Sequence, residues 1–561
     1  MSGLAALANA GVLASAAPAR ARLERALADP ARAQRAVLAR IVRENAGTAF
    51  ARAHDFAGVR AGPSLAADFR ARVPLRAWGA FGDEMRRVRA GEPGVLTAAP
   101  VRFLEPSGGS SGADKLVPYT RGLLAEFSAA TLPWLYDLLR HRPRLRAGRA
   151  YWAVTPPGSR PPHAPNAPPV GMEHDSDYFP PAARALLDRV LGVPRVVGDA
   201  PDLAACRHLT LRALLALDDL AFVSVWNPSF LTLLAAALDA GWDALLGDLE
   251  SGAVSVPLPG AVAAAARRAL PARPARAAAL RRRFGRRPPE DLGELWPRLA
   301  LVSCWADGHA ARALDGMRRR FPAVEVQPKG LLATEGVVSV PLFEAGGAVA
   351  AVTSHYLEFV PEGDASGDDA MGVEALEAGR TYEVALTTSG GLYRYRLRDL
   401  VRVEGFHRAT PVLAFRGRAD RASDLRGEKL TAAFVEDALG RALAAAGVRT
   451  PFAMLAPSWG ELPRYRLYVD ADPDGAERAA TAVEAVLRGA HHYALCRALG
   501  QLGAVEGVAV PNGEAAYERA RAARGARGGA IKPPALEPEL GWEGVFGAGA
   551  VDAVELAAVG R

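Results

Sequence analysis

The chain has 561 residues, half of them hydrophobic, so it can bury a large core and is long enough for two or more domains. Its net charge of +7 comes from 68 basic and 61 acidic residues that are interspersed, without a basic tail, which argues against nucleic acid as a partner. The three cysteines, Cys206, Cys304 and Cys496, lie far apart, so we expect no disulfide framework and no zinc site, and a cytoplasmic location.

The N-terminal segment resembles an export signal only in part. Residues Leu4 to Ala17 are apolar and contain a small-residue stretch like a cleavage site, but no lysine or arginine precedes them, so we do not expect export. No apolar run is long enough to span a bilayer, and we therefore expect no membrane partner.

The first half of the chain predicts helices and then a loop between two strands. Residues up to about Asn45 carry Ala, Leu and Arg at helical spacing. Val101 to Leu104 has the pattern of a strand, the Gly/Ser-rich stretch Ser107 to Gly112 that of a loop, and Leu116 to Thr120 that of a second strand.

The second half predicts an α/β core, an antiparallel meander and a small domain. Leu299 to Trp305 is typical of a buried strand, and a turn and a helix to Arg320 follow it. We expect the hinge near Arg418 to Gly427, which gives a large domain at 1–425 and a small α+β domain at 426–561. The meander strands are expected at Tyr382 to Thr388, Leu392 to Leu397, Leu400 to Val403 and Pro411 to Phe415, and the small-domain strands at Arg464 to Asp470 and near Val505 to Val510.

Lysine is rare in this chain, and its positions mark candidate sites. Only four of the 68 basic residues are lysines: Lys115, Lys329, Lys429 and Lys532. Lysine is a compact point charge on a flexible stem, which arginine does not replace where a phosphate must be followed. Lys532 lies among glycines and prolines in the small domain, so it could be delivered to a phosphate, or it could be an exposed tail residue.

The segment Gly108 to Gly112 matches the G-x-S-x-G nucleophile elbow of α/β hydrolases, with Ser110 as the nucleophile. The elbow needs a helix directly after the serine, whereas Val117 and Pro118 oppose a helix. A loop of hydroxyls and exposed amides, followed by Lys115, is better suited to hold phosphate oxygens, and a plain turn is the other alternative.

Two carboxylates are candidates for nucleotide contacts. Glu335 follows Thr334 after an apolar pair and could hold Mg²⁺ against phosphates, or it could be a solvated loop residue. Asp399 could accept both hydroxyls of a ribose, or it could pair with Arg396 or Arg398.

Taken together, six collinear segments resemble the Gretchen Hagen auxin-responsive proteins, which are acyl acid amido synthetases of the adenylate-forming superfamily. Two of the segments look more like the bacterial branch than the plant enzymes. The six are Phe103 to Pro118, Val225 to Leu231, Cys304 to Gly308, Lys329 to Gly336, Gly391 to Val401 and Ile531 to Pro534.

The resemblance implies a fold, an activity and a set of site residues. The fold is a large adenylate-forming, firefly-luciferase-like α/β domain with an antiparallel β subdomain, and a small α+β lid. The activity is ATP- and Mg²⁺-dependent acyl-adenylate formation from a carboxylic acid, followed by transfer to an amine, an amino acid being expected, in a monomer. The resemblance also implies roles for individual residues. The phosphates would be bound by Ser107, Ser110, Ser111 and Gly112, supported by Lys115, and Thr334 would contact the α-phosphate. Glu335 would hold Mg²⁺, Asp399 the ribose, Arg418 would assist in binding the nucleotide, and Lys532 would stabilise the charge that develops during adenylation.

The chain departs from the family pattern at the phosphate loop and beside Asp399. Pro106 and Gly109 replace a serine and a threonine, and Arg398 stands where a glycine usually precedes the aspartate. These departures keep open a nucleotide-binding protein without turnover, and the elbow keeps open a serine hydrolase. A thioester-forming ligase that uses coenzyme A is a variant of the main hypothesis. The acyl pocket is not predicted beyond the candidates Trp226, His355 and Tyr356.

Overall fold

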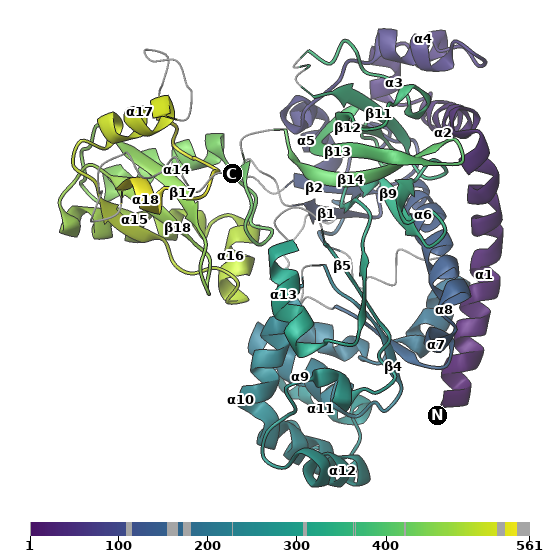
Figure 1. Ribbon diagram of the computed structural model, residues 1–561. Coiled ribbons are helices and arrows are strands. Elements are labelled where there is room, and N and C mark those ends of the chain that lie inside the picture. The colour runs from purple at the N-terminus through teal and green to yellow at the C-terminus, as the bar shows by residue number, and fades with distance from the viewer. Residues whose placement is uncertain are drawn as a thin grey trace. The chain divides into compact units, whose positions relative to one another are not determined.

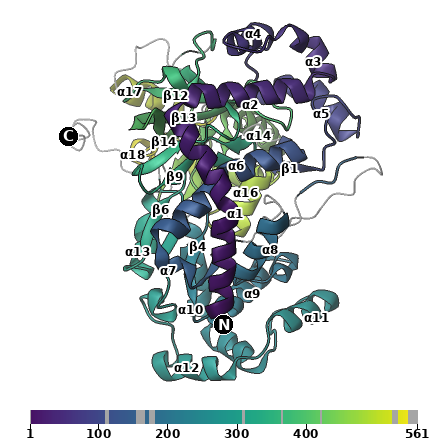
Figure 2. The same ribbon diagram turned by 90° about the vertical axis from the view of Figure 1, so that its right-hand side faces the viewer.

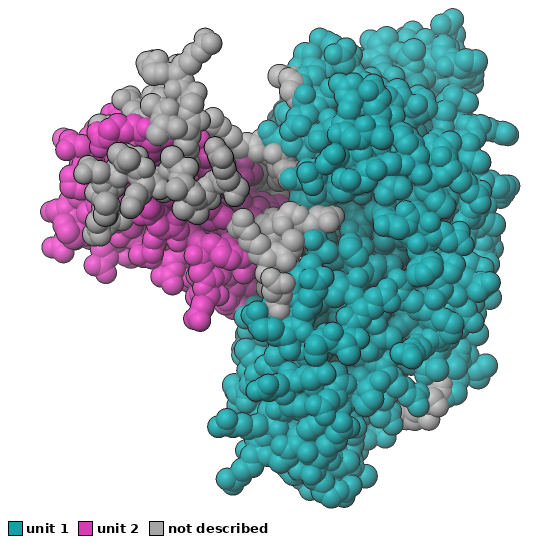
Figure 3. Space-filling view, viewed as in Figure 1, with its two compact units in different colours: residues 1–107, 116–419 teal, residues 108–115, 420–561 magenta. Residues whose placement is uncertain are grey.

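The computed structural model describes residues 2–107, 115–153, 167–171, 181–226, 228–306, 311–362, 364, 366–419, 422–523 and 533–546. The chain divides into two compact units (Figure 3). The first comprises residues 1–107 and 116–419, and the second comprises residues 108–115 and 420–561. The expected hinge near Arg418 to Gly427 and the expected domain boundary between residues 425 and 426 stay predictions.

The first unit begins with the two helices that the sequence predicts, α1 (Ser2–Ala28) and α2 (Pro30–Asn45). Asp29 caps α2 by accepting a hydrogen bond from the Arg32 amide at 3.0 Å, and a proline at the first helical position favours the start. Helix α1 lies along α6 (Arg121–His141) and α8 (Pro181–Val190) in both views (Figures 1 and 2). Three shorter helices follow α2: α3 (Ala49–Ala53), α4 (Leu65–Arg72) and α5 (Gly82–Arg89).

A four-stranded parallel sheet, in the order β3-β4-β5-β6, forms the α/β part of this unit. The predicted strand and helix between Leu299 and Arg320 are confirmed as β5 and α13. The strands are β3 (Arg149–Trp152), β4 (Leu220–Ser224), β5 (Leu301–Cys304) and β6 (Glu325–Pro328). The helices around them include α7 (Pro143–Arg146), α9 (Leu203–Leu215), α10 (Ser229–Ser251), α11 (Gly260–Ala269), α12 (Pro274–Phe284) and α13 (Ala311–Arg320).

Both faces of the parallel sheet are buried. Val223 and Val302 belong to a core cluster with residues of α9, α10, α12 and α13, whereas Phe222 and Leu301 belong to a second cluster with residues of α1 and α6. Successive side chains of a strand point to opposite faces, so β4 and β5 each contribute to both clusters. The sheet is therefore covered by helices on both sides, as a doubly wound α/β sheet is.

Helix α10 contradicts the expectation that no apolar run of this chain is long enough to span a bilayer. Its segment Phe230–Ser251 is long and apolar enough, by length and composition, to cross a membrane. Leu238 and Trp242 of this helix lie in the core of the unit, and the helix packs against α9, α12 and α13. Core helices of soluble proteins have the same length and composition.

The antiparallel meander is confirmed as a six-stranded sheet in the order β11-β12-β13-β14-β10-β9 (Figure 1). One expectation is wrong: Leu392 to Leu397 and Leu400 to Val403 are not separate strands, because Tyr395 to His407 forms one strand. Asp399, which lies between the two expected strands, pairs with Arg418 of β14, so the ladder continues through it. Within the strand, Arg396 donates to Glu383 at 2.9 and 2.6 Å. The strands are β9 (Ser339–Leu342), β10 (Gly347–Ala350), β11 (Tyr356–Pro361), β12 (Thr381–Thr387), β13 (Tyr395–His407) and β14 (Thr410–Arg418).

The second unit is the small α+β fold that the sequence predicts. Its central sheet pairs β17 with β18 antiparallel and β18 with β19 parallel. The predicted strand from Arg464 is β18, and Tyr465 and Leu467 are buried in the core of this unit. Its strands are β15 (Ala422–Ser423), β16 (Leu430–Thr431), β17 (Ala453–Ser458), β18 (Arg464–Val469) and β19 (Glu506–Ala509). Its helices are α14 (Ala432–Ala445), α15 (Pro473–Leu487), α16 (His491–Ala498), α17 (Gly513–Ala523) and α18 (Glu543–Phe546).

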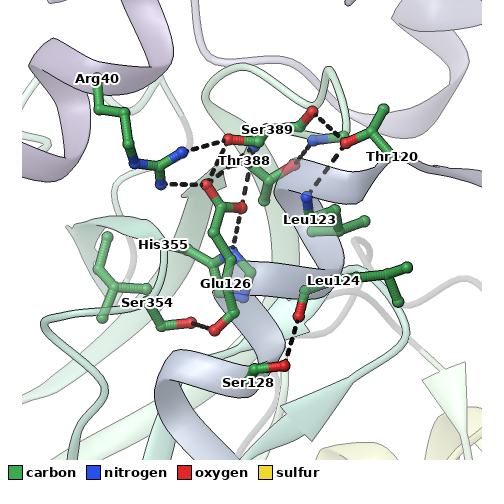
Figure 4. Close-up of polar contacts among 12 residues, drawn as sticks. Arg40, Thr120, Leu123, Leu124, Glu126, Ser128, Ser354, His355, Thr388 and Ser389 are labelled. Atoms are coloured by element: carbon green, nitrogen blue, oxygen red, sulfur yellow. Dashed lines mark hydrogen bonds and ion pairs between the residues drawn. The ribbon is translucent and has the colours of Figure 1, made fainter. Parts of the chain in front are cut away.

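A buried carboxylate on α6 ties several segments of the first unit together (Figure 4). One oxygen of Glu126 accepts from Arg40 Nη2 and from Ser389 Oγ, both at 2.6 Å. The other accepts from the Ser389 amide at 3.0 Å and lies 3.0 Å from His355 Nδ1. Burial alone would raise the pKa of Glu126, but the contacts with His355, Arg40 and Ser389 outweigh it and lower the pKa.

We expect Glu126→Gln to lower the free energy of unfolding by about 3 kcal/mol, because it removes the buried negative charge to which Arg40 Nη2 and Ser389 donate hydrogen bonds. Urea titration would measure the loss. The matched control is Glu44→Gln, which removes the half-exposed second carboxylate of the same Arg40 and should change stability by less than about 0.5 kcal/mol.

The pH dependence gives a second check on the same group. Its folded-state pKa lies below the unfolded value, so its stabilisation is complete above about pH 4.3 and is lost as the pH falls through the folded-state pKa. Wild type should lose more stability on acidification than Glu126→Gln. Equal losses in the two proteins would contradict this role.

Candidate active site

A tight hairpin presents the two catalytic candidates Thr334 and Glu335. Strand β7 (Leu332–Ala333) pairs with β8 (Gly336–Val337), and Thr334 and Glu335 form the turn between them. The hydroxyl of Tyr119 donates to the Thr334 carbonyl at 2.7 Å. Because Tyr119 ends β2 (Lys115–Tyr119), the strand that follows the Gly/Ser-rich loop also fixes this turn.

The carboxylate of Glu335 is buried and held by two hydroxyls. Its Oε1 accepts from Ser107 Oγ at 3.2 Å and from the Tyr395 hydroxyl at 3.2 Å. Ser107 ends β1 (Phe103–Ser107), and Tyr395 begins β13. Segments far apart in the sequence therefore meet at one carboxylate, next to the first residue of the predicted phosphate loop.

Asp399 and Arg418 are neighbours across the antiparallel sheet. They face each other in the register of β13 and β14, and Asp399 is buried. Arg396, one of the alternative partners considered for Asp399, donates to Glu383. Asp399 and Arg418 thus lie next to each other at one end of the sheet, and their ribose and nucleotide contacts stay predictions.

Several predicted site residues lie outside the described residues. These are Ser110, Ser111, Gly112 and Lys532, and the side chain of Arg418 is likewise not described. Lys115 is described and buried at the start of β2. A strand, not a helix, begins at Lys115, so the strand–turn–helix context of a nucleophile elbow is missing where the structure describes this segment.

Glu335 is the carboxylate that the sequence predicts for Mg²⁺. Among the described residues, no group of three or more His, Cys, Asp or Glu side chains could hold a metal ion. Magnesium is commonly bound by one or two carboxylates together with substrate phosphates. Glu335, with the hydroxyls of Ser107 and Tyr395 beside it, fits a nucleotide-borne Mg²⁺ and does not fit a stand-alone metal centre.

Sequence reasoning missed the two tyrosines that position this site. Tyr119 and Tyr395 both lie in segments that carry the family resemblance, but the sequence analysis assigned them no role. The structure buries each tyrosine at a strand end, and a buried tyrosine hydroxyl usually finds a polar partner.

The comparisons with known proteins agree with the motifs. Residues 19–326 match the model of the GH3 family N-terminal domain, and residues 348–418 match that of the GH3 family central domain. The chain belongs to the GH3 family. This is the Gretchen Hagen family that the six segments indicate.

Individual relatives in this family are distant plant proteins. The chain is 28% identical over 452 residues to the probable indole-3-acetic acid-amido synthetase GH3.12 of Oryza sativa subsp. japonica, and the matched region covers 70% of each protein. It is 38% identical over 81 residues, 14% of each protein, to the jasmonoyl–L-amino acid synthetase JAR6 of Nicotiana attenuata.

Solved structures confirm the fold class. The GH3.15 acyl acid amido synthetase superposes with a TM-score of 0.62 at 20% identity, covering 92% of this chain and 93% of that one. The complex of AtGH3.15 with 2,4-DB gives a TM-score of 0.63 at 19% identity, with the same coverage. The α/β domain with an antiparallel subdomain and a small α+β domain is therefore the GH3 fold.

The backbone beside Asp399 is strained. Arg398 has φ of 67°, in the left-handed region that glycine adopts without penalty and other residues adopt at a cost. Arg398 thus occupies the position where the family pattern has a glycine, and the structure keeps the glycine conformation. Its ion pair with Glu383 is long, at 3.5 Å.

We expect Arg398→Gly to raise the free energy of unfolding by about 0.5–1 kcal/mol, because the left-handed strain is relieved. Urea titration would measure the gain. Arg398→Ala is the control: it removes the same charge but keeps the Cβ and should give no gain. A larger gain for alanine than for glycine would contradict the strain.

Proposed function

We propose that this chain is an ATP-dependent acyl acid amido synthetase, which joins a carboxylic acid to an amine, in the first instance an amino acid. The observation that carries the proposal is the buried Glu335 carboxylate, held by Ser107 at the start of the Gly/Ser-rich loop and by Tyr395. Family membership supports it, as do the printed names of the relatives, which are amido synthetases.

In the first step, a carboxylate oxygen of the acid attacks the α-phosphorus of ATP, and pyrophosphate leaves with the electron pair of the broken P–O bond. Ser107, Ser110, Ser111 and Gly112, with Lys115, hold the phosphates. Thr334 contacts the α-phosphate. The developing negative charge is stabilised by Arg418 and by Lys532, which contribute through electrostatics.

In the second step, the nitrogen of the amine attacks the acyl carbonyl, AMP leaves, and the amine loses a proton. Asp399 accepts hydrogen bonds from the ribose hydroxyls and so keeps the nucleotide in place through both steps. The small unit acts as a lid that brings Lys532 to the phosphates. A location in the cytoplasm, a monomeric state and a place in the bacterial branch remain parts of this proposal.

Magnesium, when bound, neutralises the phosphate oxygens and makes pyrophosphate a better leaving group. Glu335 is the residue of this chain that would hold it. Ser107 and Tyr395 keep the carboxylate aimed by hydrogen bonds to one of its oxygens, which leaves the other oxygen for the ion.

The second candidate is a protein that binds nucleotide or acyl-adenylate without turnover, which Pro106 and Gly109 in the phosphate loop favour. ATP–pyrophosphate exchange over a panel of aromatic, alkyl and amino acids separates the two. Exchange with any acid supports the synthetase, whereas ATP binding without exchange supports the second candidate. Fluorophosphonate labelling of Ser110 would instead indicate a hydrolase, and coenzyme A in place of amines tests a thioester product.

We expect Glu335→Gln to lower ATP–pyrophosphate exchange by about 10²–10³-fold, because the neutral amide binds Mg²⁺ poorly. EDTA should abolish exchange in wild type, and the variant should need more Mg²⁺ for half-maximal rate. Glu344→Gln, which changes an exposed glutamate of the same unit, is the matched control and should behave as wild type. A Glu335→Gln enzyme with wild-type rate and Mg²⁺ dependence would refute the assignment.

We expect Lys532→Ala to lower exchange by at least about 100-fold while ATP still binds, because one positive charge is lost from the transition state of adenylation. Lys532→Arg should recover part of the rate. Arg527→Ala, which removes a positive charge from the same segment, is the control and should leave exchange unchanged. The role of Lys532 is wrong if its alanine variant exchanges as fast as wild type.

A further inference from the structure

Two tryptophans and a lysine follow the carboxyl ends of successive parallel strands. Trp226 follows β4, Trp305 follows β5 and Lys329 follows β6. The Trp305 amide donates to the Trp226 carbonyl at 2.8 Å, and the Lys329 amide donates to the Cys304 carbonyl at 2.9 Å, so the strand ends stay in register. Ligands of open α/β sheets bind outside this carboxyl edge.

The ammonium group of Lys329 lies between aromatic rings. Its Nζ donates to Ser224 Oγ at 2.7 Å and lies 5.0 Å from the ring centroid of Trp134 and 5.4 Å from that of Trp226. Trp134 is fixed by a hydrogen bond from its Nε1 to Gln327 Oε1 at 3.0 Å. Within the described ranges, no carboxylate lies within ion-pair distance of Lys329.

Burying a charged lysine among aromatic rings is energetically unfavourable unless an anion neutralises it. Burial lowers the pKa of Lys329 to about 7, against the opposing influence of Cys304. Cys304 supplies no negative charge near neutral pH, because burial raises the pKa of its thiol to about 12. Trp226 is 38% exposed, so a ligand can reach the rings around the amine.

Lys329 stands apart from the Glu335 centre. Tyr119, which contacts the Glu335 turn, lies before the start of α6, whereas Trp134, which contacts Lys329, lies in the second half of that helix. The two centres share none of the polar partners named above. Lys329 can therefore contact a different part of a substrate from the group that reacts near Glu335.

We propose that Lys329 binds a second, distal carboxylate of the acyl acid, so that this chain activates dicarboxylic acids. The inference rests on the proposed amide synthetase function. The reacting carboxylate is adenylated, and the distal carboxylate forms an ion pair with the Lys329 ammonium. The indole rings of Trp134 and Trp226 pack against the apolar part of the acid between the two carboxylates. Charge pairing in this partly buried place makes Lys329 a specificity residue.

The test compares each α,ω-dicarboxylic acid with its monomethyl ester, which has the same length but no distal charge. We expect the wild-type KM in ATP–pyrophosphate exchange to be at least about tenfold lower for the diacid. Lys329→Met should raise the KM of the diacid by a similar factor with little change in kcat or in the KM of the monoester. Equal preference for diacid and monoester in wild type, or a preference unchanged in Lys329→Met, would overturn the proposal.

A control variant and a pH profile separate this role from packing. Arg142→Met removes a cation that also lies over a ring, 5.4 Å from Phe343, but that has its own carboxylate in Glu325; it should keep the diacid preference. Only the protonated amine pairs with the diacid, so its KM should rise above about pH 7 in wild type and stay flat in Lys329→Met. A pH dependence that survives in Lys329→Met would count against the pairing.

A direct binding measurement keeps this inference distinct from the proposed reaction. If no acid supports exchange in wild type, the synthetase proposal fails, and thermal shift with the diacid and the monoester still tests Lys329. Stabilisation of wild type, but not of Lys329→Met, by the diacid alone supports the distal carboxylate site. Equal shifts with both ligands, or in both proteins, refute it.

Discussion

The buried carboxylate of Glu126 is the interaction on which the first unit depends, because an ionised group in a core must find its partners inside the protein. Those partners come from α2, from the residue before β11 and from the turn after β12 (Figure 4). None of these segments is close to the others in sequence. The charge therefore specifies how the N-terminal helices, α6 and the antiparallel sheet come together.

The same network positions the candidate active site. Thr120 caps α6 and donates from its side chain to the Ser389 carbonyl at 2.9 Å, so the end of β2 is tied to the turn that Glu126 holds. On the other side, a Cβ on Gly336 would lie 3.0 Å from the ring of His355, so His355 packs directly against the residue after Glu335. Tyr119 and Glu335 thus reach one centre because the residues next to them are fixed by one buried charge.

Local sequence patterns predicted several helices and strands, and the motifs predicted the family. Periodicity indicated the N-terminal helices, β5 with α13, and the meander, and the six segments indicated the family. The sequence could not predict that Tyr395 would begin one long strand, because Asp399, between the two expected strands, finds its partner Arg418 only across the sheet in β14. Nor could it find Glu126, since a glutamate within an amphipathic helix has the same local pattern whether its carboxylate meets water or three distant donors.

Arginine and lysine meet different partners in this fold, and those partners are distant in sequence, so the role of Lys329 could not be assigned from the sequence alone. Arginine here serves buried carboxylates through its planar fork, as Arg394 does with Glu358 at 3.0 Å and Arg149 with Asp219 at 2.8 Å. Lys329 instead meets a hydroxyl and two ring faces. The planar guanidinium of an arginine would need more hydrogen-bond acceptors than the Ser224 hydroxyl provides. The single ammonium group of a lysine, on its flexible stem, can turn from Ser224 to an incoming anion. Lys329 thus occupies a position where a point charge suits an incoming anion better than a planar guanidinium does.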